Sequence, residues 1–102
     1  MTDISQQRKA LTERILDGAG TAAQSERQAA FENTGLAESV RTLIQKVATQ
    51  ATAVTDRDIA AARVSGLTEN QILEIVICAA VGQSTRQYDS ARAALDAAIS
   101  KE

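Results

Sequence analysis

The stretch Ser65-Gly66-Leu67-Thr68-Glu69-Asn70-Gln71-Ile72 decides the fold expected for this chain. It stands between an amphipathic segment that begins at Thr55 and the almost wholly apolar segment 72–81. Gly66 lies where a left-handed residue ends a helix, and Thr68-x-x-Gln71 has the form of a capping box that opens the next helix. The stretch therefore predicts a sharp joint between two helices.

The segments before this joint predict four helices. Thr55 caps the helix that leads into the joint, with Asp58 at its third position. Upstream, 36–52 carries apolar residues at spacings of three and four, which is the pattern of a helix with one buried face. Near the N-terminus we expect a helix over 3–17, then a second one that Thr21-x-x-Gln24 opens and that ends near Glu32.

Two helices are also expected after the joint. The β-branched run in 72–81 is assigned to a buried helix, because a capping box precedes it and two alanines follow it. Gly82 is expected to kink or end that helix. A final helix over 84–99 is then expected to turn its apolar side chains inward; these are Tyr88, Ala91, Leu95, Ala98 and Ile99.

Composition supports an all-α fold. The 102 residues include no proline and only two aromatic side chains. We expect a compact bundle of five to six helices in a single domain (1–102), with an N-terminal helical arm (1–33) and a core (36–99). A core built from small aliphatic side chains is thin, so we also expect a homo-oligomer whose interface includes 72–81.

Charge and hydropathy exclude several classes of function. The net charge is −2 and no basic block is present, so nucleic-acid binding is not expected. No apolar run approaches the roughly 20 residues that span a bilayer, and the N-terminus lacks the pattern of a signal peptide. The expected location is the cytoplasm. The single cysteine, Cys78, is expected to be buried and structural, with a raised pKa.

The reactive side chains restrict the chemistry further. Without histidine, a Ser-His-Asp arrangement and zinc sites built on Cys and His are excluded, and no cofactor or metal is expected. The candidates for catalysis, if the chain is an enzyme, are Glu38, Asp58, Arg86 and Tyr88. Glu74 interrupts an apolar helix, and we expect it to be exposed on a polar stripe with Gln71; pairing or a functional role are the alternatives.

From Leu36 to Leu95 the chain resembles the alkylhydroperoxidase D-like and carboxymuconolactone decarboxylase superfamily. The residues that carry the resemblance are the helix end Ala60-Ala61-Ala62-Arg63-Val64, the Gly66-Leu67-Thr68-Glu69 joint, and the apolar helix into Ala79-Ala80. The resemblance implies an all-helical fold and a homo-oligomer that is commonly trimer-based.

The resemblance does not carry the redox chemistry of the superfamily. Redox-active members place Cys-x-x-Cys-x-x-x-His on the helix before the joint, and those positions are Ala51, Val54 and Asp58 here. We therefore expect a redox-inactive protein that acts in binding or assembly, including as the partner of a cysteine-bearing paralogue. The alternative is a non-redox decarboxylase or isomerase that uses the carboxylate, arginine and tyrosine candidates in the interhelical cleft.

Overall fold

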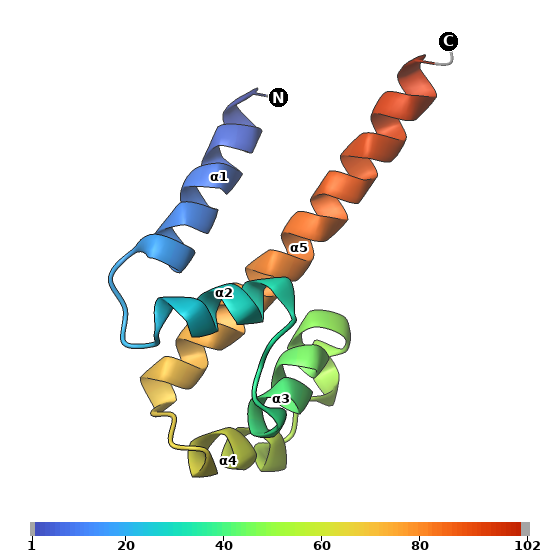
Figure 1. Cartoon of the computed structure of the whole chain (residues 1–102). Helices are drawn as coiled ribbons and strands as arrows, with labels where there is room; N and C mark the ends of the chain where they lie inside the picture. The colour runs from blue at the N-terminus through green and yellow to red at the C-terminus, as the bar shows by residue number, and fades with distance from the viewer. Residues whose placement is uncertain (1, 101–102) are drawn as a thin grey trace.

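The computed structural model describes residues 2–100, and within that range it contains five α-helices, one short 3-10 helix and no strand (Figure 1). The elements are α1 (Thr2–Asp17), α2 (Gln24–Glu32), α3 (Glu38–Thr49), η1 (Ala51–Ala53), α4 (Asp56–Val64) and α5 (Glu69–Ser100). The expected all-α class is confirmed.

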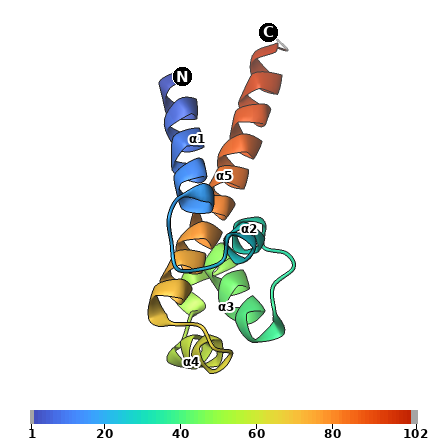
Figure 2. The same ribbon diagram turned by 60° about the vertical axis from the view of Figure 1, so that its left-hand side comes forward.

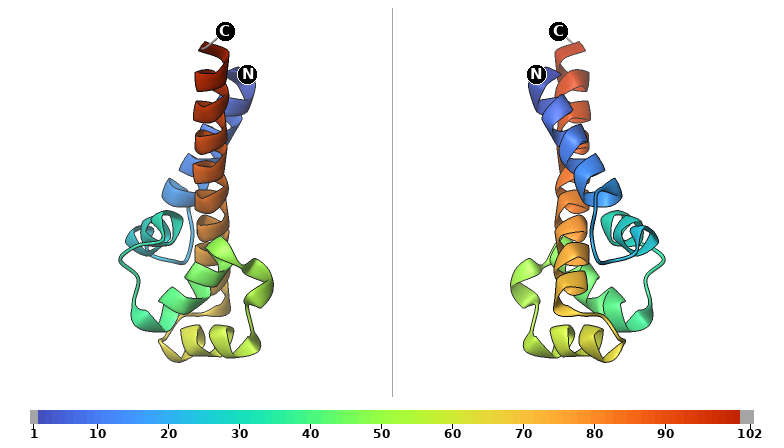
Figure 3. Two further views of the ribbon diagram at one scale, coloured as in Figure 1. Left: turned by 90° about the vertical axis from the view of Figure 1, so that its right-hand side faces the viewer. Right: turned by 90° about the vertical axis from the view of Figure 1, so that its left-hand side faces the viewer.

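Helix α5 is the long axis around which the other helices are placed. The helices α2 and α3 pack against its first half, and α4 crosses beneath its start (Figure 3). Helix α1 runs beside the middle of α5, and the two helices diverge toward the N- and C-termini, which lie at the same end of the molecule (Figure 2).

The molecule is elongated. Its extents are 54 × 29 × 21 Å and its radius of gyration is 15.4 Å, whereas a compact domain of this length has a radius of about 13 Å. The expectation of a compact bundle is therefore wrong, because the last turns of α5 project beyond the other helices.

The core lies between the first half of α5 and the helices α2 and α3. The apolar stripe of α3 is buried, and Ile44 is fully inaccessible to solvent. It meets the inner face of α5, where Ile75 and Ala79 are also fully buried. From α2, the small side chain of Ala30 completes this layer, so α2 packs closely across α5 although it belongs to the expected N-terminal arm.

The joint has the local geometry that its sequence predicts. Thr55 and Asp58 form a reciprocal capping box at the start of α4. The backbone N–H of Thr68 donates to Gln71 Oε1, and the backbone N–H of Gln71 donates to the Thr68 hydroxyl, at 2.9 and 3.1 Å. Between them Gly66 adopts φ 107°, a conformation that glycine tolerates. Both boxes are confirmed.

The capping box expected at Thr21 is wrong. The residue that precedes α2 is Ala23, and no side chain caps the helix there. Thr21 instead donates to Glu74 on α5. The end of α2 does follow its sequence, since Asn33 takes a left-handed conformation and its N–H bonds back to the last turn.

Gly82 does not interrupt α5. The helix continues to Ser100, and Gly82 lies where α2 crosses it: a Cβ there would collide with the backbone of Phe31. Glycine is needed for this close approach, so the expected kink is wrong. The expected inner face of a final helix is wrong as well, because every residue of 91–100 is exposed and only Tyr88 is half-buried.

Helix α3 ends at Thr49, earlier than the expected Thr52, and after Gln50 the short helix η1 follows. No single helix within residues 2–100 has both the length and the apolar character needed to cross a membrane; the α4–α5 pair meets the criteria together but is bent by 118°.

Candidate functional site

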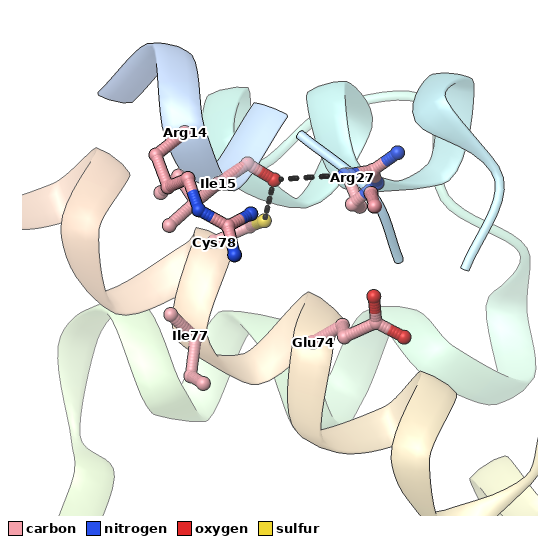
Figure 4. Close-up of a pocket in the computed structure, with 7 residues that line it drawn as sticks. Arg14, Ile15, Arg27, Glu74, Ile77 and Cys78 are labelled. Atoms are coloured by element: carbon pink, nitrogen blue, oxygen red, sulfur yellow. Dashed lines mark hydrogen bonds between the residues drawn. The ribbon is translucent and has the colours of Figure 1, made fainter. Parts of the chain in front are cut away.

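A pocket opens where the end of α1 and the start of α2 meet α5 (Figure 4). Its volume is about 290 Å³. The residues that line it are Arg14, Ile15, Ala19, Arg27, Glu74, Ile77 and Cys78. It therefore combines two guanidinium groups, one carboxylate and one thiol with an apolar floor.

Glu74 ties the loop between α1 and α2 to α5. Its carboxylate accepts hydrogen bonds from the backbone N–H of Thr21 at 2.9 Å, from that of Ala22 at 3.0 Å, and from the Thr21 hydroxyl. The Thr21 hydroxyl bond is the largest cause that lowers the pKa of Glu74. Gln71 adds a bond from its side-chain amide to the Thr21 carbonyl. The expectation of an exposed Glu74 is wrong, and the pairing alternative holds.

Arg27 is almost completely buried, with 7% of its surface exposed. Its Nη1 donates to the carbonyl oxygens of Ile15 at 3.2 Å and Gly18 at 2.7 Å, so it caps the C-terminal end of α1. Its Nε is also buried and has no hydrogen-bond partner among the described residues. Figure 4 shows the carboxylate of Glu74 turned toward this guanidinium group.

Cys78 lies beside the same carbonyl group and is buried, as expected. Its Sγ donates to the Ile15 oxygen at 3.7 Å. Burial raises the pKa of the thiol, which outweighs the opposing effect of the Arg27 charge. The thiol is therefore protonated near neutral pH and packs as a small apolar side chain.

The two acidic candidates for catalysis lie at the starts of two different helices. Asp58 accepts hydrogen bonds from Thr55 and, at 2.9 Å, from Lys46. The Lys46 bond is the main cause that lowers the pKa of Asp58. Glu38 is exposed in the first turn of α3. Asp58 thus has a capping role.

The two remaining candidates have partners of their own. Arg86 donates to the Phe31 carbonyl oxygen at 2.7 Å and so caps the end of α2. The ring of Tyr88 lies beneath the guanidinium group of Arg8, 4.6 Å from it. In the contacts described for residues 2–100, no two of the four candidates meet.

The positions that replace the redox motif do not share one helix. Ala51 begins η1, Val54 is an extended residue that packs against the core, and Asp58 belongs to α4. Among residues 2–100 no three carboxylate or thiolate groups gather closely enough to hold a metal ion.

Sequence reasoning did not single out Arg27 or Arg14, and it assigned Thr21 to a helix cap and not to this site. One signal for Arg27 was present, because it lies three residues before Ala30 and so shares the face of α2 that packs on α5. Thr21 and Arg14 carry no such signal, since their role depends on how α1 turns back onto α5.

A second feature is the apolar side of the projecting end of α5. Leu95 and Ile99 are each 58% exposed there, although both are large and apolar. They line a shallow groove of about 370 Å³ together with Tyr88, Ala91, Arg92 and Asp96. Two of the outward residues in 72–81, Leu73 and Ile77, are exposed too.

We compared the chain with protein-family models, with curated proteins and with solved structures, and none of the three comparisons found a match.

Proposed function

We propose that the protein acts by assembly: two copies associate through the projecting end of α5, and the chain has no peroxidase activity of its own. The observation that carries the proposal is the uncovered apolar side of residues 91–100, with Leu95 and Ile99 more than half exposed. We further propose that the chain is a redox-inactive relative of the alkylhydroperoxidase D-like proteins, which the helix–joint–helix geometry at Gly66 supports.

The projecting end needs a partner for energetic reasons. Isolated helices of this length are marginal in water, and most helix stability in proteins comes from packing of an apolar face. Each of residues 91–100 is exposed, and a hydrogen bond from Arg92 to the Ser5 hydroxyl of α1, at 2.6 Å, adds no apolar packing, so within one copy this source of stability is missing. Contiguous exposed apolar surface of this kind commonly marks an interaction site.

The pattern on this segment suits a second copy of the same segment. In an antiparallel pair with its two-fold axis at Leu95, the two Leu95 side chains meet, and Ile99 lies against Ala91 of the partner subunit. On either side of the Leu95 pair, a large side chain then faces a small one, which allows close packing. Such a pair is isologous, as two-fold interfaces are.

The charges beside this pattern are also self-complementary. Arg92 and Asp96 lie one turn apart on the same flank of α5. In the antiparallel pair, each Arg92 lies close to Asp96 of the partner subunit, so the pairing gains two opposite-charge contacts. A parallel pair would instead place this flank of the two copies on opposite sides of the interface, so neither opposite-charge contact would form. The antiparallel arrangement is therefore the one proposed.

The most direct test is the oligomeric state of a variant with a charge in the apolar stripe. We expect the wild-type chain to sediment as a dimer or higher oligomer and Leu95→Asp to sediment as a monomer. Ala93→Asp is the matched control, since it adds the same charge to the opposite face of the same turn. A monomeric wild type, or equal dissociation by both variants, would contradict the proposal.

A charge exchange tests the orientation. Arg92→Asp and Asp96→Arg should each weaken association, because each variant brings like charges together across the interface. The variant with both changes should recover it. If recovery fails while Leu95→Asp still dissociates the assembly, the stripe is used but the antiparallel register is wrong.

The absence of peroxidase activity has its own test. Reduction of a peroxide through an internal disulfide needs two cysteines, and this chain has one. We expect no turnover of hydrogen peroxide with a dithiol reductant, with Cys78→Ala as the matched background. Turnover by the pure wild-type protein above that background would overturn this part of the proposal.

A further inference from the structure

We propose that the pocket between α1, α2 and α5 binds a small organic monocarboxylate, held by Arg27 and Arg14 above an apolar floor. The site is separate from the projecting end of α5 and does not depend on the assembly proposed above.

The first argument is the unused hydrogen-bonding capacity of the Arg27 guanidinium group. Burial of a charged group is costly unless the charge is paired and its donors are satisfied. The ion pairs in the described residues are Lys46–Asp58 and Arg63–Glu69, so Arg27 takes part in neither. Among residues 2–100, hydrogen bonds are described for its Nη1 alone, to two neutral carbonyl groups, and the buried Nε has no partner there. A planar guanidinium group with free donors matches the two oxygens of a carboxylate.

The second argument is the charge of the pocket. Arg14 and Arg27 supply two positive charges and Glu74 supplies one negative charge. The oxygens of Glu74 accept hydrogen bonds from Thr21 and Ala22, so this carboxylate, although it faces Arg27, is already engaged by the loop. One positive charge is left over, and a ligand with a single negative charge neutralises it.

The third argument is the size and the lining of the pocket. A volume of about 290 Å³ lies just below the range of roughly 300–1,000 Å³ that ligand pockets occupy, so the ligand is small. Apart from these charged groups and Cys78, the lining is apolar and is formed by Ile15, Ala19 and Ile77. This combination favours a short apolar body with one carboxylate over an inorganic anion, which would leave the apolar floor uncovered.

The test uses hexanoate as the probe and observes the Nε–H resonance of Arg27 and the methyl resonances of Ile15 and Ile77 by NMR. Increasing concentrations of hexanoate should shift the Arg27 resonance and both groups of methyl resonances until the site is saturated. Hexanamide, which has the same shape without the charge, should bind about tenfold more weakly, because a charge-assisted hydrogen bond is lost. Inorganic phosphate should move the Arg27 resonance without moving the methyl resonances.

A variant at Arg14 adds a second readout that leaves the buried contacts intact, since this side chain is exposed. Arg14→Gln should weaken hexanoate binding about threefold, as expected for a partly screened charge, and Arg14→Lys should recover most of the loss. Arg57→Gln removes the same charge from the outer surface of α4 and should bind as the wild type does.

Three results would overturn the proposal. The first is that hexanoate leaves the Arg27 and methyl resonances unmoved. The second is that hexanamide binds as tightly as hexanoate does. The third is that Arg14→Gln and Arg57→Gln weaken binding equally, since the effect would then report net charge and not the pocket.

Discussion

The two halves of α5 form one unbroken helix in two different environments. In the first half, Ile72, Ile75 and Ala79 are buried under α2 and α3, whereas the last ten residues that the structure describes are all exposed. The first half is held by packing under α2 and α3, whereas the contacts described for the second half are polar side-chain contacts with α1, such as those of Arg8 with Tyr88 and of Ser5 with Arg92. The comparison shows that one secondary-structure element can contain both a core and a surface reserved for another molecule.

The largest difference between the halves should appear when the same residue type is truncated in each. Ile75→Ala should lower the free energy of unfolding by about 3 kcal/mol, because it opens a cavity in a fully buried site. Ile99→Ala should change it by less than about 0.5 kcal/mol under dilute, monomeric conditions. Urea unfolding followed by circular dichroism measures both values, and equal losses would erase the distinction.

The next largest effect concerns Gly82, where α2 crosses α5. Alanine is the better helix former by about 1 kcal/mol. We nevertheless expect Gly82→Ala to destabilise the protein by about 2 kcal/mol, because the added methyl group would meet the Phe31 backbone and force α2 away. The same urea experiment decides the sign, and a gain in stability would mean that the crossing is looser than described.

A smaller effect is expected from Glu74, which links the packed half of α5 to the α1–α2 loop. Glu74→Gln should cost about 1 kcal/mol at neutral pH, because charge-assisted hydrogen bonds to Thr21 are weakened. Asn70→Asp is a suitable surface control on the same turn, since that residue is exposed.

The pH dependence gives an independent check on Glu74. Its pKa in the folded protein is lowered from the ordinary value of 4.5, mainly by the Thr21 hydroxyl bond. A carboxyl group whose pKa is lowered by folding stabilises the folded state at pH values above its pKa in the unfolded chain. This contribution is lost as the pH falls through its pKa in the folded protein. The wild type should therefore lose more stability than Glu74→Gln as the pH falls below about 4.5. Parallel stability curves would contradict this.

The smallest effect should come from the backbone of the exposed half. Glycine in a rigid helix costs about 1 kcal/mol relative to alanine. We expect Ala94→Gly to lower global stability by much less, because the projecting end opens locally without the core. Hydrogen exchange should show faster exchange confined to the last turns. A full loss of stability would place the projecting end within the cooperative core.

The joint and its two helices could be predicted from the sequence because their signals are local. The boxes at Thr55 and Thr68 and the left-handed Gly66 act within a few residues. The failures concern long-range contacts. The local pattern at Thr21 resembles a cap, but Glu74 on a distant helix competes for it. Gly82 resembles a helix breaker, yet its lack of a side chain allows the backbone of α2 to cross α5 closely.

The candidate site was predicted least well for the same reason. The burial of Cys78 follows from its apolar neighbours, whereas the pocket beside it depends on the position of α1 and on Arg27 of α2. The exposed stripe of α5 was recognised as apolar, but a periodic pattern gives the face of a helix and not the molecule that covers it.

The buried position of Cys78 makes the reactivity of its thiol a measure of how often the surrounding helices separate. It is the single thiol in the sequence and is 1% exposed, in contact with α1 through the Ile15 carbonyl group. The thiol lines the pocket but Cys78 is only 1% exposed, so alkylation by iodoacetamide should be slow in the folded protein and should accelerate when α1 or α2 separates from α5. The rate of this alkylation thus reports the opening of the core without any introduced cysteine.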